Sequence, residues 1–179
     1  METIEAVSHL DGVQVYNARP SGARAWVWDV VQDADGRPVI LHTRHPEETD
    51  HRYHWARWTG QAWQDVELCK AGRWFPETPQ GIVEPEPHYS GGMCLNQGNP
   101  FQICGARQVN GVFEIVSWNR FDEGKSWVER TITHNSQHLN VRPVIPVGMP
   151  QDNAHVLFMS GPYRHYTDCH TSIQWRPLP

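Results

Sequence analysis

The sequence predicts an all-β fold, and three observations carry this prediction. The 179 residues include 14 Gly and 14 Pro that are spread along the chain, which indicates frequent chain reversals. The runs between these turn residues are rich in Val, Ile, Trp, Tyr and Phe, the residue types that favour strands. No stretch of about twelve residues combines a clean helical period of 3.6 with helix caps. We therefore expect strands joined by tight turns.

Two predicted hairpins form a first unit, residues 26–70. Each hairpin has a Gly-containing turn between two strand-like runs, and these turns lie at residues 33–36 and 59–60. The four expected strands are residues 26–31, 38–43, 53–58 and 62–66.

The same arrangement recurs in residues 88–134 and, more weakly, in residues 139–176. The expected strands of the second unit are residues 91–95, 100–104, 112–118 and 127–130, and those of the third are residues 141–146, 155–159, 166–168 and 173–175. A period of roughly 50 to 60 residues with four strands per unit is typical of β-propeller blades. We expect a partial propeller of about three four-stranded antiparallel blades, preceded by residues 1–25 as an incomplete blade or edge strand.

Three blades cannot close a ring, because propellers have roughly 4 to 8 blades. An open stack would also leave two sheet faces uncovered. The chain is therefore expected to be a fragment of a longer propeller, or to complete the ring by associating with copies of itself. A homo-oligomer is the predicted form.

The charge of the chain bears on its partners. The net charge is −5, and the 15 Lys and Arg residues form no cluster or stripe. We therefore expect neither a nucleic acid nor an anionic membrane as the partner. The first five residues are acidic where a secretory leader would be basic, and no apolar stretch approaches the ~20 residues of a membrane span. No signal peptide is expected in this chain, and its cellular location stays open.

The four cysteines are widely spaced and contain no CxxC pair, which favours free thiols. No cofactor is predicted. A structural zinc is the alternative, and its candidate ligands are Cys94, Cys104, Cys169, His88, His165 and His170. The nine tryptophans are expected mainly to pack between sheets.

The stretch "RFDEGKSW", residues 120–127, resembles the Asp-box of bacterial neuraminidase repeats. Asp122, Gly124, Ser126 and Trp127 match its pattern, while Arg120 stands where the box has a hydroxyl residue. In that family the box is structural: the Asp caps backbone amides of a turn and the aromatic residue packs inward. The resemblance therefore points to a fold.

A wider resemblance extends from Trp26 to Trp175. The segments "DADGRPVILHTRH", "YHWARWTGQAW", "YSGGMCLN", "RQVNGVFEIVSW", "NVRPVIP" and "RHYTDCHT" look like the C-terminal blades of neuraminidase-repeat propellers. Polysaccharide lyases that cut ulvan, a sulfated rhamnose and uronate polymer, are similar to these proteins. The resemblance implies an acidic polysaccharide or oligosaccharide as the partner, and β-elimination at a uronate as the leading chemistry. Relatives of this kind are exported.

A uronate lyase needs a cation on the carboxylate, a base near the C5 hydrogen and an acid near the leaving oxygen. Arg, His and Tyr suit these tasks, and the resemblance places them on the blades. The expected catalytic residues are Tyr89 and Arg107 first, His45 or His54 as the imidazole, and Arg142 facing the same cleft. Trp55, Tyr163 and Tyr166 are candidates for stacking on sugar rings.

Two other classes of function stay open. A chain that lacks the catalytic residues of its relatives would be a carbohydrate-binding module or a structural scaffold. A sialidase-like hydrolase ranks lower, because the early Arg-Ile-Pro-type strand of sialidases is absent from the sequence.

Overall fold

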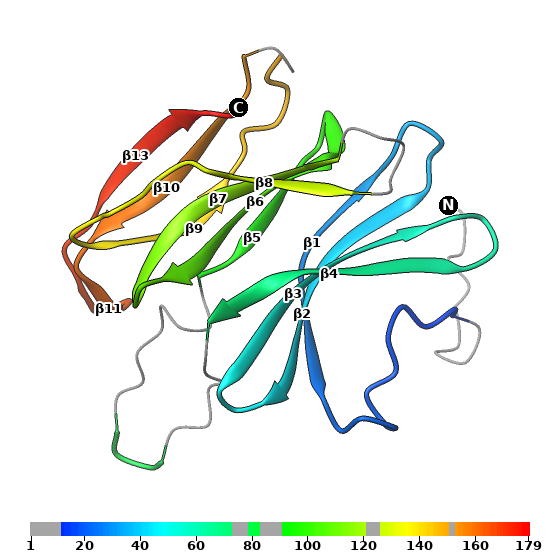
Figure 1. The fold of residues 1–179 in the computed structure, drawn as a ribbon, viewed down its shortest axis with the longest axis horizontal. Coiled ribbons are helices and arrows are strands. Elements are labelled where there is room, and N and C mark those ends of the chain that lie inside the picture. The colour runs from blue at the N-terminus through cyan, green and yellow to red at the C-terminus, as the bar shows by residue number, and fades with distance from the viewer. Residues whose placement is uncertain (1–11, 73–78, 83–90, 121–125, 151–152) are drawn as a thin grey trace, which may run out of the picture.

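The computed structural model describes residues 12–72, 79–82, 91–120, 126–150 and 153–179. These residues form thirteen strands and no α-helix, which confirms the all-β prediction. Three larger antiparallel sheets stand side by side in chain order (Figure 1), and a two-stranded hairpin accompanies the third. None of the residues described here forms a helix that could cross a membrane.

The first sheet has four strands in chain order: β1 (Arg24–Gln32), β2 (Pro38–Glu47), β3 (Asp50–Trp58) and β4 (Trp63–Gly72). The turn between β1 and β2 forms as the sequence predicts. Asp33 Oδ1 accepts hydrogen bonds from the backbone N–H groups of Asp35 and Arg37, both over 2.9 Å. Gly36 has a φ of 72°, a conformation that is easy only for glycine. Asp33 thus fixes the register of the hairpin.

The middle sheet also has four strands in chain order: β5 (Met93–Asn96), β6 (Asn99–Val109), β7 (Val112–Arg120) and β8 (Trp127–Thr131). Trp127 packs against Trp55 of the first sheet, with ring centroids 5.3 Å apart. Asp122 and Gly124 of the Asp-box lie outside the described residues, so only the inward packing of Trp127 can be compared with that motif.

The third sheet differs from the expected four strands. It has three, in the order β13-β10-β9, and these are β9 (Leu139–Val144), β10 (His155–Gly161) and β13 (Ser172–Pro177). The strand expected at residues 166–168 is instead part of a short hairpin, β11 (Tyr163–His165) with β12 (Asp168–Cys169). Thr167 accounts for this, because its N–H and its hydroxyl both lie within hydrogen-bond distance of His165 Nδ1 and close a local turn.

Two hydrophobic clusters hold the three sheets together. Successive side chains along each strand of the middle sheet point to opposite faces of the sheet. Ile103 packs in the cluster shared with the first sheet, and the adjacent Cys104 packs in the cluster shared with the third. A glycine at position 105 is required for Trp118 to pack in the cluster shared with the first sheet, since a Cβ there would lie 2.7 Å from Trp118 Cζ3. The middle sheet is therefore buried on both faces.

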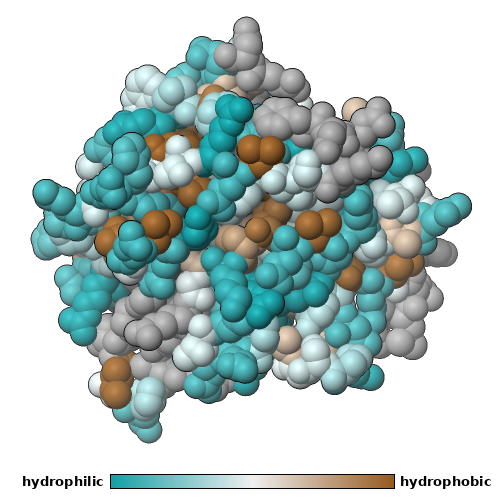
Figure 2. Space-filling model, viewed as in Figure 1, coloured by the Kyte–Doolittle hydropathy of each residue, from teal (hydrophilic) through white to brown (hydrophobic). Residues whose placement is uncertain are grey.

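The N-terminal residues that the structure describes lie against the first sheet. The Val13 carbonyl accepts a hydrogen bond from Trp63 Nε1 over 3.2 Å. Arg44 stacks on the Tyr16 ring, with its guanidinium carbon 3.9 Å from the ring centroid. On the side of the molecule drawn in Figure 2, hydrophilic residues predominate and hydrophobic ones are scattered among them. The largest fully buried apolar side chains, such as Trp55, Trp118 and Phe113, lie in the clusters between the sheets.

Candidate functional site

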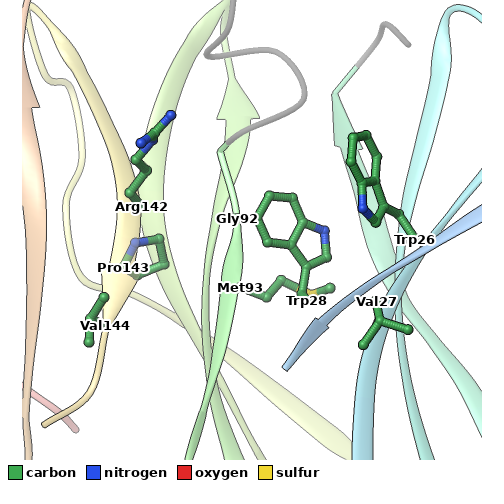
Figure 3. Close-up of a pocket in the computed structure, with 8 residues that line it drawn as sticks. All are labelled: Trp26, Val27, Trp28, Gly92, Met93, Arg142, Pro143 and Val144. Carbon is green, nitrogen blue, oxygen red and sulfur yellow. The ribbon is translucent and has the colours of Figure 1, made fainter. Parts of the chain in front are cut away.

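A pocket of about 390 Å³ opens where the first strands of the three sheets meet. Figure 3 shows the residues of β1 on one side, those of β9 on the other, and the start of β5 between them. The lining residues are Trp26, Val27 and Trp28 of β1, Gly92 and Met93 at the start of β5, and Arg142, Pro143 and Val144 of β9. This volume is in the range of small-molecule sites, roughly 300 to 1,000 Å³.

Hydrogen bonds tie the three strands together around the pocket. Asp29 Oδ2 on β1 accepts from the Leu95 N–H on β5 over 2.8 Å. The Arg142 N–H on β9 donates to the Gly91 carbonyl over 2.8 Å. The pocket walls are therefore fixed relative to one another.

Arg142 has an unusual backbone. Its φ of 55° lies in the left-handed region, which costs a residue other than glycine of order 1 to 3 kcal/mol. The hydrogen bond to Gly91 holds it there and places its exposed side chain at the pocket. Strain of this kind is concentrated at binding sites in proteins, which makes Arg142 a candidate for ligand contact.

Tyr163 orients the Arg142 side chain. Arg142 Nη2 donates to the Tyr163 hydroxyl over 2.7 Å, and the guanidinium carbon lies 5.2 Å from the centroid of the Tyr163 ring. Tyr163 is buried in the cluster between the middle and third sheets. A rigid phenol thus holds a flexible cation in one position.

Two tryptophans give the pocket an aromatic wall. Trp26 is 48% exposed although its indole is one of the largest apolar groups in the chain. Trp28 lies two residues further along β1 and is half-buried. Exposed indole faces stack on the apolar faces of sugar rings, and a guanidinium pairs with a carboxylate or sulfate.

The structure brings together two of the residues expected to act on the ligand, Arg142 and Tyr163. Tyr89 lies outside the described residues. Arg107 on β6 does not line the pocket, and its Nη2 pairs with Glu129 Oε1 over 2.5 Å.

The two histidines expected to supply an imidazole lie on opposite faces of the first sheet. Thr43 pairs with Tyr53, and His45, two residues after Thr43 on β2, lies on the same face as that pair. His54 pairs with His42 on the other face. Burial lowers the pKa of His45 to about 4, and the charge of Arg24 adds to this, so His45 is neutral at pH 7. Neither histidine lines the pocket beside Arg142.

The two remaining stacking candidates are placed differently from each other. Trp55 is fully buried in the core and its Nε1 donates to the Pro100 carbonyl over 3.0 Å, so neither face of its ring is open to a sugar. Tyr166 is 68% exposed on the β11-β12 hairpin, beside His165 and outside the pocket lining.

The proposed zinc ligands do not form a cluster among the residues described. Cys94 and Cys104 are free thiols on adjacent strands, facing the core between the middle and third sheets. Burial raises the pKa of the Cys94 thiol to about 12, so it is protonated at neutral pH. His88 lies outside the described part of the chain.

Trp26 and Trp28 were not among the predicted ligand-contact residues, because the tryptophans were expected mainly to pack between sheets. Trp28 does pack against the core between the first and middle sheets, and it lines the pocket as well. One signal could have found the two tryptophans. They lie two residues apart on a strand predicted at the start of a sheet, and alternation alone would place both on one side of an edge strand. In the structure β1 has a bulge between Val27 and Asp29, and Val27 lines the pocket as well.

Comparison of the chain with known proteins gave no match to a protein family, to a curated protein or to a solved structure.

Proposed function

We propose that this protein binds an acidic oligosaccharide in the pocket between β1, β5 and β9. The observation that carries the proposal is the pairing of an exposed indole, Trp26, with a positioned guanidinium, Arg142, in one pocket. An acidic sugar offers the matching chemistry, an apolar ring face and an anionic group. A single guanidinium also suits one carboxylate better than a chain of phosphates.

The arrangement of the sheets supports a propeller-type interpretation of this pocket. The first strand of each sheet reaches it, as the innermost strands of blades reach a propeller's central channel. We infer that the three sheets are blades of a partial propeller related to the neuraminidase-repeat proteins, and that the pocket lies beside its axis.

Self-association is a separate part of the proposal. The outer face of the third sheet carries apolar side chains away from the pocket: Leu157, Ile173 and Trp175. We propose that this face packs against a second copy. Sedimentation of the folded protein as a monomer at micromolar concentration would contradict this part of the proposal and leave the binding proposal intact.

Uronate β-elimination is the second candidate function. It is favoured by the contact between Arg142 and Tyr163, because a lyase needs a cation on the carboxylate and a phenol near the reacting carbon. The described residues that line the pocket include no histidine, so an imidazole would have to come from another part of the chain. This is why binding ranks above turnover.

Calorimetric titration with a panel of oligosaccharides tests the proposal. We expect uronate and sulfated oligosaccharides to bind, and neutral ones of equal length to bind at least about 10-fold more weakly, because one charge-assisted hydrogen bond is worth about 1.5 to 3 kcal/mol. Equal affinity for neutral and acidic sugars, or no binding to any, would contradict it. Ultraviolet absorbance of unsaturated uronate products, measured in the same samples, distinguishes a lyase from a binding protein.

A further inference from the structure

A second group of reactive side chains lies on the first sheet, on the face turned away from the middle sheet. His42 of β2 is directly opposite His54 of β3, and Asp65 of β4 pairs with Ala56, two residues beyond His54. The potential ligand atoms of the two histidines and of Asp65 all lie within 4.8 Å of one another. Within the described ranges, this is the one group of three such side chains that could hold a metal ion.

The potential ligand atoms of this group are close to the spacing around a metal ion. His54 Nδ1 lies 2.9 Å from Asp65 Oδ1, a hydrogen-bond distance that a metal would lengthen, and His42 Nε2 lies 3.5 Å from Asp65 Oδ2. A tetrahedral zinc ion with bonds of about 2.0 to 2.1 Å keeps its ligand atoms about 3.3 to 3.4 Å apart. We propose that His42, His54 and Asp65 bind Zn²⁺.

The hydrogen bonding of the two imidazoles supports this assignment. Both histidines are buried, and neither Nε2 atom makes a hydrogen bond to the residues described. A zinc ion would satisfy His42 Nε2. With the metal on Nδ1 of His54, its Nε2 would donate toward Glu67 Oε2, now 3.9 Å away. A carboxylate behind a metal-bound imidazole is a common supporting contact.

Arg44 competes with the metal for Asp65. Its guanidinium contacts Asp65 Oδ2. This contact shows that the Asp65 carboxylate is placed to pair with a cation. Zinc must displace Arg44, whose guanidinium already has an alternative contact on the Tyr16 ring.

Because Arg44 competes with zinc for Asp65, the proposal predicts that some substitutions lower the zinc affinity and that another raises it. Zn²⁺ is titrated into the full chain against a chromophoric chelator, with circular dichroism to establish that each variant is folded. The parent is expected to bind one Zn²⁺. His42→Gln and Asp65→Asn are expected to lower the affinity at least about 100-fold, since even supporting residues are worth 10- to 100-fold. Arg44→Gln is expected to raise it about 10-fold, because it removes a neighbouring positive charge.

His138→Gln, a substitution of an exposed histidine, is the matched control and should leave the affinity unchanged. The proposal is overturned if the parent binds no zinc, if His42→Gln and Asp65→Asn bind as the parent does, or if Arg44→Gln binds more weakly. Should the two ligand variants unfold, the visible spectrum of Co²⁺ bound to the parent decides. An intense tetrahedral spectrum supports the proposal, and a weak octahedral spectrum overturns it.

Discussion

The Arg142 guanidinium donates a hydrogen bond to the Tyr163 hydroxyl over 2.7 Å and lies above the same ring. Tyr163 is anchored in the core, while Arg142 projects from a strained backbone position at the edge of a pocket. The pair therefore holds a positive charge at a fixed place beside exposed aromatic surface, and this relationship is the basis of the proposed function.

Tyr163→Phe should weaken binding of an acidic oligosaccharide about 5-fold, because it removes one hydrogen bond, worth about 1 kcal/mol, that orients the guanidinium. The ring and its packing are retained, so the free energy of unfolding should change by less than the binding energy does. Titration calorimetry with denaturant unfolding measures both. A loss of stability without a loss of affinity would assign Tyr163 to the core alone.

Trp26→Ala should weaken the same binding about 10-fold, since it removes a stacking face of the pocket. Trp175→Ala is the matched control, because Trp175 is also exposed but lies on the outer face of the third sheet. Equal effects of the two substitutions would place the sugar elsewhere.

Gly105→Ala should destabilise the protein by about 1 to 3 kcal/mol, the usual cost of overpacking a core. The added methyl group would meet the Trp118 indole at 2.7 Å. The double variant Gly105→Ala, Trp118→Phe should recover part of the loss, because the smaller ring vacates that space. Chemical denaturation of the three variants measures the effect, and full additivity of the two changes would argue against this contact.

Glu114→Gln should lower the free energy of unfolding by about 1 to 3 kcal/mol at pH 7. Burial alone would raise the pKa of Glu114, but hydrogen bonds from Thr133, Ser136 and Asn140 lower it below its usual value. The stabilisation is therefore present above the unfolded pKa of about 4.3 and lost as the pH falls through the folded pKa. Denaturation at several pH values should show the parent and the variant converging in acid. A constant difference would contradict this.

The sequence predicted the strands well where local chemistry determines them. The first hairpin was predictable because its turn depends on nearby residues only. Asp33 accepts hydrogen bonds from the turn backbone, and Gly36 adopts a positive φ. The third sheet was less predictable, since the run near Thr167 contains strand-forming residues but is turned by its contact with His165.

The pocket could be predicted only in part. Arg142 was a candidate, but its partner across the pocket, Trp26, comes from the other end of the described chain, and only the stacking of sheets brings them together. Arg107 was predicted because the resemblance places a carboxylate-binding Arg at a comparable blade position. The sequence could not reveal that Glu129 of β8 pairs with it across the intervening strand β7. The sequence did not indicate that His45 and His54 would lie on opposite faces of the first sheet.

The most direct test of the account is a calorimetric titration of Arg142→Gln and Arg176→Gln with one uronate oligosaccharide in one buffer. Arg176 is an exposed arginine of the third sheet that does not line the pocket. We predict that Arg142→Gln binds about 10- to 100-fold more weakly than the parent, the value of a charge-assisted hydrogen bond, and that Arg176→Gln binds as the parent does. Unchanged binding by Arg142→Gln, or an equal loss in both variants, would contradict a ligand site between β1, β5 and β9.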